Sequence, residues 1–470
     1  MSKPSSAVLL AGWGGAVRST ARVLSVTTEG EIAAAFREAA RSRCPIGFRG
    51  AGCSYGDAAL NDGGVILDLS RMNRVIEFDP KLGVVRAEVG VTIRDLWRLG
   101  IAHGYWPPVV SGTAVPTLGG VVAANIHGKN AFHAGTIANH LDSFRVVLPS
   151  GEVRTITPTN DPELFYAIPG SFGLLGCITE VTLRMRQVPG GNLKVSVVAP
   201  RSLSEMILEF EARKATSDYL VGWIDGFAKG TELGRGVIHQ ANYVDLSVDS
   251  NAKFALNAFA QDPPDTILGI VPKSVLWRFL RPWVNDFGMR LVNSAKDLLA
   301  RRQARLGESY LQSHAAFAFL LDYVPGWKRS YGSGGLIQYQ SFIPSEEAER
   351  VHGEMLRLAQ ARDLVPYLLV YKRHLPEPFL MTHAVDGYSM AMDFRVTPSR
   401  RAALWALCQR YDELVAESGG RIYFAKDATA TAESVARIFC KDLDRFIALR
   451  RRLDPAGILR TDLASRLGLV

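Results

Sequence analysis

The stretch from Ser111 to Asn130 combines the residue types that a large flat ligand needs. Its first part is built mainly from Gly, Ala, Val and Thr, and its end carries His127, Lys129 and Asn130. Small residues leave main-chain N–H groups uncovered and let the backbone approach a ligand closely, and the polar residues that follow can titrate or form hydrogen bonds. The alternative is a tight turn into an alanine-rich core helix, with His127 as a structural histidine.

A second loop of small residues, 50–57, has the sequence Gly-Ala-Gly-Cys-Ser-Tyr-Gly-Asp. Two such loops, each following an extended segment, suit a dinucleotide held between two backbone cradles, and this arrangement favours FAD. Residues 7–17 superficially look like a strand entering a nicotinamide-binding turn. That motif fails because Val17 stands where a small residue is needed and no amphipathic helix follows at once.

The elements expected around these loops are short strands and helices, without long helices between parallel strands. Apolar periodicity and capping residues predict helices at 27–45, 92–99, 345–362, 399–418, 434–452 and 461–467 and one starting at 202, and strands at 46–49, 64–69, 75–78, 84–89, 144–148, 153–156, 178–185, 193–198, 219–224, 335–344 and 388–396. The pattern indicates an α+β fold with mixed sheets.

The composition is that of a folded protein of two domains, or of one domain with another inserted. The chain has 470 residues, of which 47% are hydrophobic and 21% are charged. Its net charge of +8 invites a nucleic-acid or membrane interpretation. No nucleic-acid recognition motif is present, so we expect no nucleic-acid partner, and an anionic substrate or lipid headgroup explains the excess as well.

The five cysteines are scattered and form no CxxC pair, which argues against a disulfide framework and against a metal site. A reducing compartment fits best. The first 15 residues lack the charged region of a signal peptide, and no run of about 18 apolar residues occurs. We therefore expect a cytoplasmic protein, with peripheral contact at the inner face of the cell membrane left open.

One segment, 272–306, interleaves Lys and Arg with Trp, Phe, Leu and Val. This pattern fits a basic amphipathic element that lies on a membrane surface. The alternative is a solvated helix face whose apolar side lies in the core.

Three segments in order resemble the vanillyl-alcohol-oxidase-type FAD proteins, which share the PCMH-type FAD-binding domain. They are 48–57, which looks like the first pyrophosphate loop, 117–120, which looks like the second, and 163–180. The resemblance narrows to the decaprenylphosphoryl-β-D-ribose 2'-oxidase family through 12–14, 126–130, 338–340, 425–427 and 451–455, and it covers nearly the whole chain.

The resemblance implies a two-subdomain FAD-binding domain of residues 1–190, completed by the C-terminal segment 421–470. An α+β substrate domain of residues 191–420, built on an antiparallel sheet, is inserted between them. The resemblance also implies FAD-dependent oxidation of the 2'-hydroxyl of a polyprenyl-phosphoryl pentofuranose to a ketone by hydride transfer. This is the first half of a ribose-to-arabinose epimerisation, and a separate NAD(P)-dependent short-chain reductase would complete it.

The same resemblance implies the site. Lys426 orients or deprotonates the reacting hydroxyl, and Lys372 and His127 position the sugar phosphate. The residues expected at FAD are Trp13, Arg49, Gly50, Ala51, Gly52, Cys53, Ser54, Tyr55, Gly112, Thr113, Thr117, Gly119, Gly120, Ala124, Asn125, His127, Gly128, Asn130, Gly173, Ile178 and Lys426. Those expected at the substrate are Tyr55, Trp223, Gln338, Gln340, Lys372, Ser389 and Ala391.

Two departures from the family pattern matter. Many related enzymes tether the flavin through a histidine in the first loop, where this chain has Cys53, so we expect non-covalent FAD. On the substrate side, Ser389, Ala391 and Ala318 replace an asparagine, a cysteine and an aromatic residue. These replacements leave the flavin assignment intact and leave the identity of the sugar and its lipid carrier open.

Two other functions stay open at this point. An aldonolactone- or alditol-oxidase-like enzyme would act on a soluble sugar derivative, but Lys426 and Lys372 disfavour it because a neutral polyol offers two cations no anion. A non-catalytic protein could instead retain the flavin-type scaffold and bind a membrane surface through segment 272–306.

Overall fold

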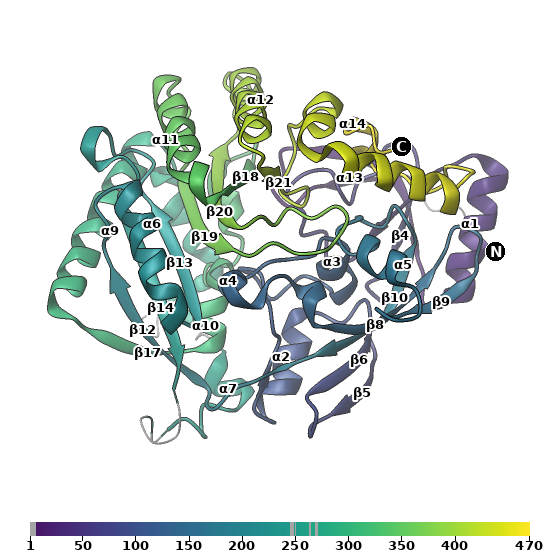
Figure 1. The fold of residues 1–470 in the computed structure, drawn as a ribbon, viewed down its shortest axis with the longest axis horizontal. Coiled ribbons are helices and arrows are strands. Elements are labelled where there is room, and N and C mark those ends of the chain that lie inside the picture. The colour runs from purple at the N-terminus through teal and green to yellow at the C-terminus, as the bar shows by residue number, and fades with distance from the viewer. Residues whose placement is uncertain (1–5, 245–248, 250, 263–264, 268–270) are drawn as a thin grey trace.

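The computed structural model describes residues 6–244, 249, 251–262, 265–267 and 271–470 (Figure 1). Three sheets organise this part of the chain, with four, five and eight strands. The first five residues, on which the expectation of no signal peptide partly rests, lie outside the described range. None of the helices in that range is long and apolar enough to cross a membrane.

The four-stranded sheet is mixed. Its order is β1 (Val8–Ala11), β2 (Arg18–Ser25), β4 (Val65–Asp68) and β3 (Ile46–Arg49), and only β1 runs antiparallel to its neighbour. Helix α1 (Glu29–Ser42) connects β2 to β3; Thr28 and Glu31 form its capping box and Ile32 and Phe36 are buried. The expectation that no long helix joins parallel strands was wrong here, because two strands that run parallel need such a crossover.

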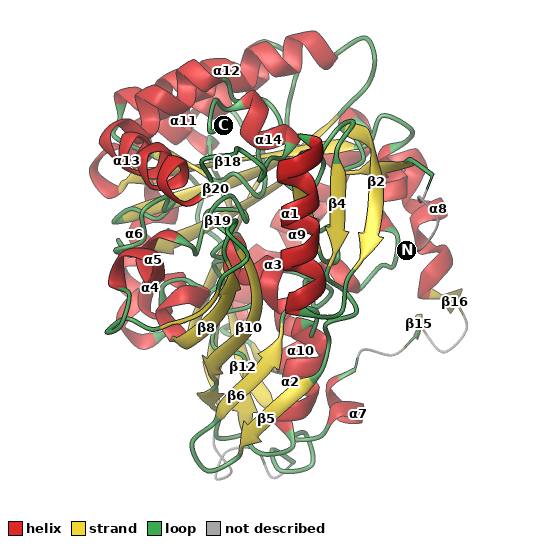
Figure 2. Ribbon diagram, turned by 90° about the vertical axis from the view of Figure 1, so that its right-hand side faces the viewer, coloured by secondary structure: helices red, strands yellow, loops and turns green. Residues whose placement is uncertain are grey.

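The five-stranded sheet is antiparallel (Figure 2). Its order is β5 (Val75–Asp79), β6 (Val84–Glu88), β10 (Cys177–Arg184), β8 (Leu141–Val147) and β9 (Val153–Ile156). The helices in this region are α2 (Ile93–Ile101), α3 (Leu118–Ala123), α4 (Ala131–Ala134) and α5 (Pro162–Ala167). Helix α3 packs on β10, and this contact fixes the loop that precedes it.

The eight-stranded sheet is antiparallel throughout. Its order is β17 (Ser309–Ser313), β12 (Asn192–Val198), β14 (Gly236–Tyr243), β13 (Tyr219–Ile224), β19 (Leu368–His374), β20 (Gly387–Arg395), β18 (Leu336–Pro344) and β21 (Arg421–Ile422). Helices α6 (Leu203–Arg213), α11 (Ser345–Ala361) and α12 (Arg401–Glu417) pack on one face. On the other face, Ala300 of α9 (Asp286–Leu306) clusters with Val197, Trp223 and Val237.

The remaining elements are short, except for one helix near the C-terminus. They are β7 (Tyr105–Trp106), which pairs with β11 (Arg186–Gln187), β15 (Thr266–Ile267), which pairs with β16 (Val271–Pro272), and the helices α7 (Ala258–Gln261), α8 (Leu276–Leu280), α10 (His314–Ala318), α13 (Ala432–Leu453) and α14 (Asp462–Arg466). The strands and helices predicted from the sequence are present, with ends that differ by a few residues.

The C-terminal segment packs back on the N-terminal part. The Ile46 N–H donates to the Ile458 carbonyl at 2.7 Å, and the Arg460 N–H donates to the Ile46 carbonyl at 2.9 Å. Further along, the Arg466 guanidinium lies 2.7 Å from Asp57 and 2.8 Å from Asp427. This double ion pair ties α14 both to the loop 50–57 and to the segment that carries Lys426.

Replacing Arg466 by Met should therefore destabilise the protein. Asp57 and Asp427 are buried, and removing the cation leaves two buried carboxylates without compensation, so we expect a loss of about 3 kcal/mol in the free energy of unfolding. Arg460→Met, on the same segment but exposed, should change it by less than about 0.5 kcal/mol. Urea unfolding of both variants measures the difference, and equal losses would contradict the assignment.

Candidate cofactor and substrate cavity

One cavity of about 530 Å³ brings the two glycine loops and the eight-stranded sheet together. Its wall is formed by the loop after β3, the stretch from Val110 to Asn130, the segment 172–178, strands β13, β14 and β19, and residues 423–426. Distant parts of the sequence thus meet at a single site.

The first glycine loop presents unused hydrogen-bond donors to this cavity. Residues 51–54 line it, and no described residue accepts a hydrogen bond from their main-chain N–H groups. Buried or half-buried N–H groups need an acceptor, and a row of them suits an anion. The second loop lies against the first, since a Cβ at Gly50 would stand 2.1 Å from Thr117 Oγ1. The residues present therefore fit a diphosphate held between the two loops.

Most of the residues predicted from the sequence line the cavity. On the cofactor side these are Trp13, Arg49, Gly50, Ala51, Gly52, Cys53, Ser54, Tyr55, Gly112, Thr113, Thr117, Gly119, Gly120, Ala124, His127, Asn130, Gly173, Ile178 and Lys426, and on the substrate side Tyr55, Trp223, Gln338 and Lys372. Five others do not line it: Asn125, Gly128, Gln340, Ser389 and Ala391.

Asn125 and Gly128 shape the turn around His127. The Asn125 side chain donates to Glu377 at 2.9 Å and accepts from the Ala138 N–H at 3.2 Å, and its φ of 45° is left-handed. A Cβ at Gly128 would come within 2.6 Å of Asn130 Oδ1. Both residues hold the polypeptide in place rather than lining the cavity.

Gln340 and Ser389 lie behind His127 instead of facing the cavity. Gln340 Oε1 lies 3.3 Å from His127 Nε2, and the Gln340 amide donates to Ser389 Oγ at 3.0 Å. Ser389 Oγ in turn lies 2.8 Å from His374 Nε2. Ala391, which is buried, pairs with Gln340 across β18 and β20. None of the three lines the cavity, and their contact with the substrate stays a prediction.

This network determines which ring nitrogen of His127 carries the proton. Because Gln340 Oε1 can only accept, Nε2 carries the hydrogen and Nδ1 accepts from Lys372 Nζ, which lies 3.5 Å away. Burial, with the nearby charge of Lys372, holds the pKa of His127 well below its usual range. His127 is therefore a neutral imidazole with a defined tautomer.

Four lysines line the cavity: Lys129, Lys296, Lys372 and Lys426. Burial lowers the pKa of Lys129 to about 7 and of Lys296 to about 8, and it lowers the pKa of Lys372 well below the usual range with help from Lys426 and Lys129. No described carboxylate offsets these three shifts. Near Trp223, Lys296 Nζ lies 4.3 Å from the ring centre. These amines therefore lose their charge more readily than exposed lysines do, and an anion bound beside them would favour the charged form.

Lys426 alone has a carboxylate nearby. Burial lowers its pKa and raises the pKa of Asp393, while each charge favours the other. Gln338 donates to Asp393 Oδ1, and Asp393 Oδ2 has no partner among the described residues. A lysine with a lowered pKa at a cavity wall can exchange a proton near neutral pH.

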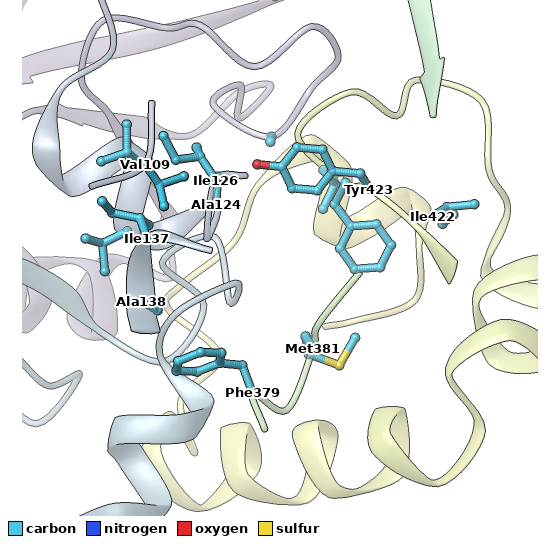
Figure 3. Packing of buried hydrophobic residues seen from close by; sticks show 14 of the residues in the cluster. Val109, Ala124, Ile126, Ile137, Ala138, Phe379, Met381, Ile422 and Tyr423 are labelled. Atoms are coloured by element: carbon cyan, nitrogen blue, oxygen red, sulfur yellow. The ribbon is translucent and has the colours of Figure 1, made fainter. Parts of the chain in front are cut away.

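Several cavity residues were missed by the sequence analysis. They are mainly apolar or aromatic side chains from strands and turns, together with two histidines and one lysine: Phe48, Trp106, Val110, Phe172, Tyr219, His239, Lys296, His314, Phe317 and Tyr423. Figure 3 shows the ring of Tyr423 directed toward Ala124 and Ile126. Its position three residues before Lys426 was a usable signal, whereas His239 and His314 carried none. No group of metal-ligating residues is found in the described part of the chain.

The comparisons with known proteins agree with this cavity. An FAD binding domain model matches residues 20–157. Decaprenylphosphoryl-beta-D-ribose oxidase of Mycolicibacterium smegmatis is 30% identical over 473 residues, 99% of each chain. A putative D-arabinono-1,4-lactone oxidase of Neurospora crassa is 25% identical over 91% of this chain and 80% of its own. A D-lactate dehydrogenase of Anaerostipes hadrus is 30% identical over 42% of this chain and 40% of its own.

The protein is an FAD-dependent oxidoreductase with a PCMH-type FAD-binding domain. Within that class, the chain belongs to the decaprenylphosphoryl-β-D-ribose oxidase family. FAD is its cofactor, and the unpaired N–H groups of residues 51–54 are suited to its diphosphate. The alternative of a non-catalytic binding protein is set aside by these relatives.

The lowered pKa values of the cavity lysines predict that the protein takes up protons when it binds a sugar phosphate. Lys129 and Lys296 lose their charge as the pH rises through about 7 and about 8, and a bound anion restores it. The Kd should therefore rise between about pH 7 and pH 9, by up to about tenfold per pH unit for each proton taken up.

Calorimetry of the FAD-loaded protein in two buffers of different ionisation enthalpy measures this uptake. The same sugar without its phosphate is the control, and we expect it to take up no protons. Equal proton uptake with both ligands would contradict the assignment of the lysines to an anion.

Proposed function

We propose that this protein oxidises the 2'-hydroxyl of a polyprenyl-phosphoryl pentofuranose to a ketone, as the first half of a ribose-to-arabinose epimerisation. The observation that carries the proposal is the group of buried lysines without carboxylate partners in the cavity that also holds the two glycine loops. A phosphoryl group supplies the missing anion. The name of the relative from Mycolicibacterium smegmatis supports a phosphoryl ribose as the substrate class.

In this proposal each residue of the cavity has a separate role. When bound, FAD would supply the acceptor for the hydride that leaves the carbinol carbon. Lys426 lies at the cavity wall with a lowered pKa, so its amine orients the hydroxyl and takes its proton. Lys372 holds the phosphoryl group, and neutral His127 fixes the position of Lys372 Nζ by accepting a hydrogen bond from it at Nδ1. Trp223 and Tyr55 supply apolar walls around the sugar.

We also propose the domain division for this function. Residues 1–190 and 421–470 hold FAD, and residues 191–420 carry the substrate side of the cavity. The ties from Ile46 and Asp57 to the C-terminal segment support the return of the chain, and the eight-stranded sheet supports the inserted domain. The keto product requires a reductant, so a separate NAD(P)-dependent short-chain reductase is the proposed partner. The cytoplasmic location stays a prediction.

A second candidate is an oxidase of a soluble aldonolactone or alditol. The similarity to the putative D-arabinono-1,4-lactone oxidase favours it. The buried lysines weigh against it, because a neutral polyol would leave their charges without an anion.

The test is anaerobic reduction of the bound flavin by candidate substrates. The loss of the visible absorbance of the flavin measures the reduction. A polyprenyl-phosphoryl ribose should bleach the flavin, while free pentoses and alditols should not. Lys426→Met should slow the bleaching at least about 100-fold, since it removes the proton acceptor, and the exposed Lys441→Met serves as the matched control. Bleaching by free polyols alone would favour the second candidate, and normal bleaching of Lys426→Met would remove that residue from its role.

FAD should be dissociable. Burial raises the pKa of the Cys53 thiol to about 12, so it stays protonated and is a poor nucleophile toward the flavin. Precipitation with acid should leave the yellow colour in the supernatant, for the wild type and for Cys53→Ala alike. Colour that stays in the wild-type pellet and leaves the Cys53→Ala pellet would show a cysteinyl bond instead.

A further inference from the structure

Helix α9 exposes its apolar side and buries its polar side. Asn293, Asp297 and Ala300 are buried, while Phe287, Leu291 and Leu298 have exposed fractions of 68%, 49% and 70%. These three exposed residues follow the spacing i, i+4, i+11 and so share one face of the helix. A helix on the surface of a water-soluble protein normally shows the opposite arrangement.

Specific contacts hold this orientation. Asn293 Nδ2 donates to Asp225 Oδ1 at 3.0 Å, and Asp225 pairs with Arg235 at 2.9 Å. Asp297 lies 3.8 Å from that same arginine, Arg235, and forms an ion pair with it. Turning the helix to bury its leucines would break these bonds and leave buried charges unpaired. The apolar face is therefore directed outward by the fold itself.

The exposed apolar residues of the described chain are concentrated in the stretch of sequence that contains this helix. Of 25 large apolar side chains that are exposed, 15 lie between residues 254 and 323. That stretch also contains every exposed aromatic residue among them: Phe254, Phe259, Phe279, Trp283, Phe287, Tyr310 and Tyr323. Figure 1 shows α9 at the left-hand edge of the molecule. A patch of this kind marks an interaction surface.

The charge on this surface is positive. Arg302 and Arg305 are exposed on α9, and Arg281 is exposed in the turn η5 (Arg281–Trp283). None of the three forms an ion pair with any residue in the described ranges. Aromatic and aliphatic side chains beside unpaired arginines suit a bilayer with anionic headgroups. A second copy of the same face would bring like charges together in a symmetric dimer.

The surface also reaches the cavity. Helix α9 contributes Lys296 to the cavity wall, and Leu320 both lines the cavity and has an exposed fraction of 57%. Leu320 thus offers an apolar contact at the exit of the cavity to a ligand that carries an apolar chain.

We propose that α9, together with α8 and η5, is a docking surface for an anionic lipid bilayer. Phe287, Leu291 and Leu298 enter the headgroup region, and Arg281, Arg302 and Arg305 contact the lipid phosphates. The proposal extends the function above by naming the surface that brings the cavity to its lipid substrate. It does not depend on that substrate, because the docking is to bulk lipid.

Sedimentation of the FAD-loaded full chain with vesicles tests this surface without any sugar substrate. Binding should be at least about tenfold stronger to phosphatidylcholine vesicles that contain phosphatidylglycerol than to phosphatidylcholine alone, and should weaken with salt. Leu291→Ser with Leu298→Ser should lower binding about tenfold, as should Arg302→Glu with Arg305→Glu. Leu208→Ser on α6, where the exposed fraction is 66%, is the matched control.

Retained FAD absorbance and an unchanged unfolding temperature show that each variant is folded. The proposal is overturned if both double variants bind as the wild type does, or if binding ignores vesicle charge. It is also overturned if the wild type is a dimer that the leucine variants convert to monomers, since the face would then join two copies. Failure of flavin bleaching would leave the vesicle result unaffected, so the two proposals are separable.

Discussion

The site depends on the ion pairs that Arg466 forms with Asp57 and Asp427. One arginine near the end of the chain neutralises a carboxylate in the first glycine loop and another next to Lys426. The two segments are also in backbone contact, since Tyr55 N–H donates to the Ala425 carbonyl at 2.8 Å and a Cβ at Gly56 would stand 1.8 Å from the Asp427 carbonyl. The loop that is suited to the FAD diphosphate and the lysine proposed to act on the substrate are therefore tied together in one unit.

A second constraint is the set of four lysines buried inside the cavity. Burial disfavours the charged form of each, and the charges of Lys426 and Lys129 lower the pKa of Lys372 further. Such an arrangement costs stability in the free protein and becomes favourable when an anion enters. The proposed preference for a phosphoryl ligand over a neutral sugar rests on this cost, because only an anion removes it.

The sequence was sufficient to predict the parts of the site that lie on continuous motifs. Residues 50–55, Thr117, Gly119 and Gly120 line the cavity, because a backbone cradle needs small residues at closely spaced positions. Gln338 and Gln340 show what the sequence could not predict. Strand alternation puts both on the same face of β18, but His127, which comes from a distant loop, covers Gln340 and leaves Gln338 at the cavity. Only the tertiary packing reveals which of two equivalent positions is accessible.

The orientation of the helix in segment 272–306 could not be predicted from the sequence either. The periodicity of the segment predicted an amphipathic helix and left open which side faces the core. The side is decided by partners far away in the sequence, Asp225 and Arg235, which fix Asn293 and Asp297 inside. Lys296 lies on that same helix and lines the cavity as a consequence. The sequence pattern alone had assigned it to a basic surface.

The most direct measurement of the central claim is a crystal structure of the protein with FAD and a phosphoryl pentofuranose. Our account predicts the FAD diphosphate against the N–H groups of residues 51–54, the substrate phosphoryl group within hydrogen-bond distance of Lys372 Nζ, and the 2'-hydroxyl beside Lys426. A substrate phosphoryl group bound away from the buried lysines, or a diphosphate away from the first glycine loop, would contradict it.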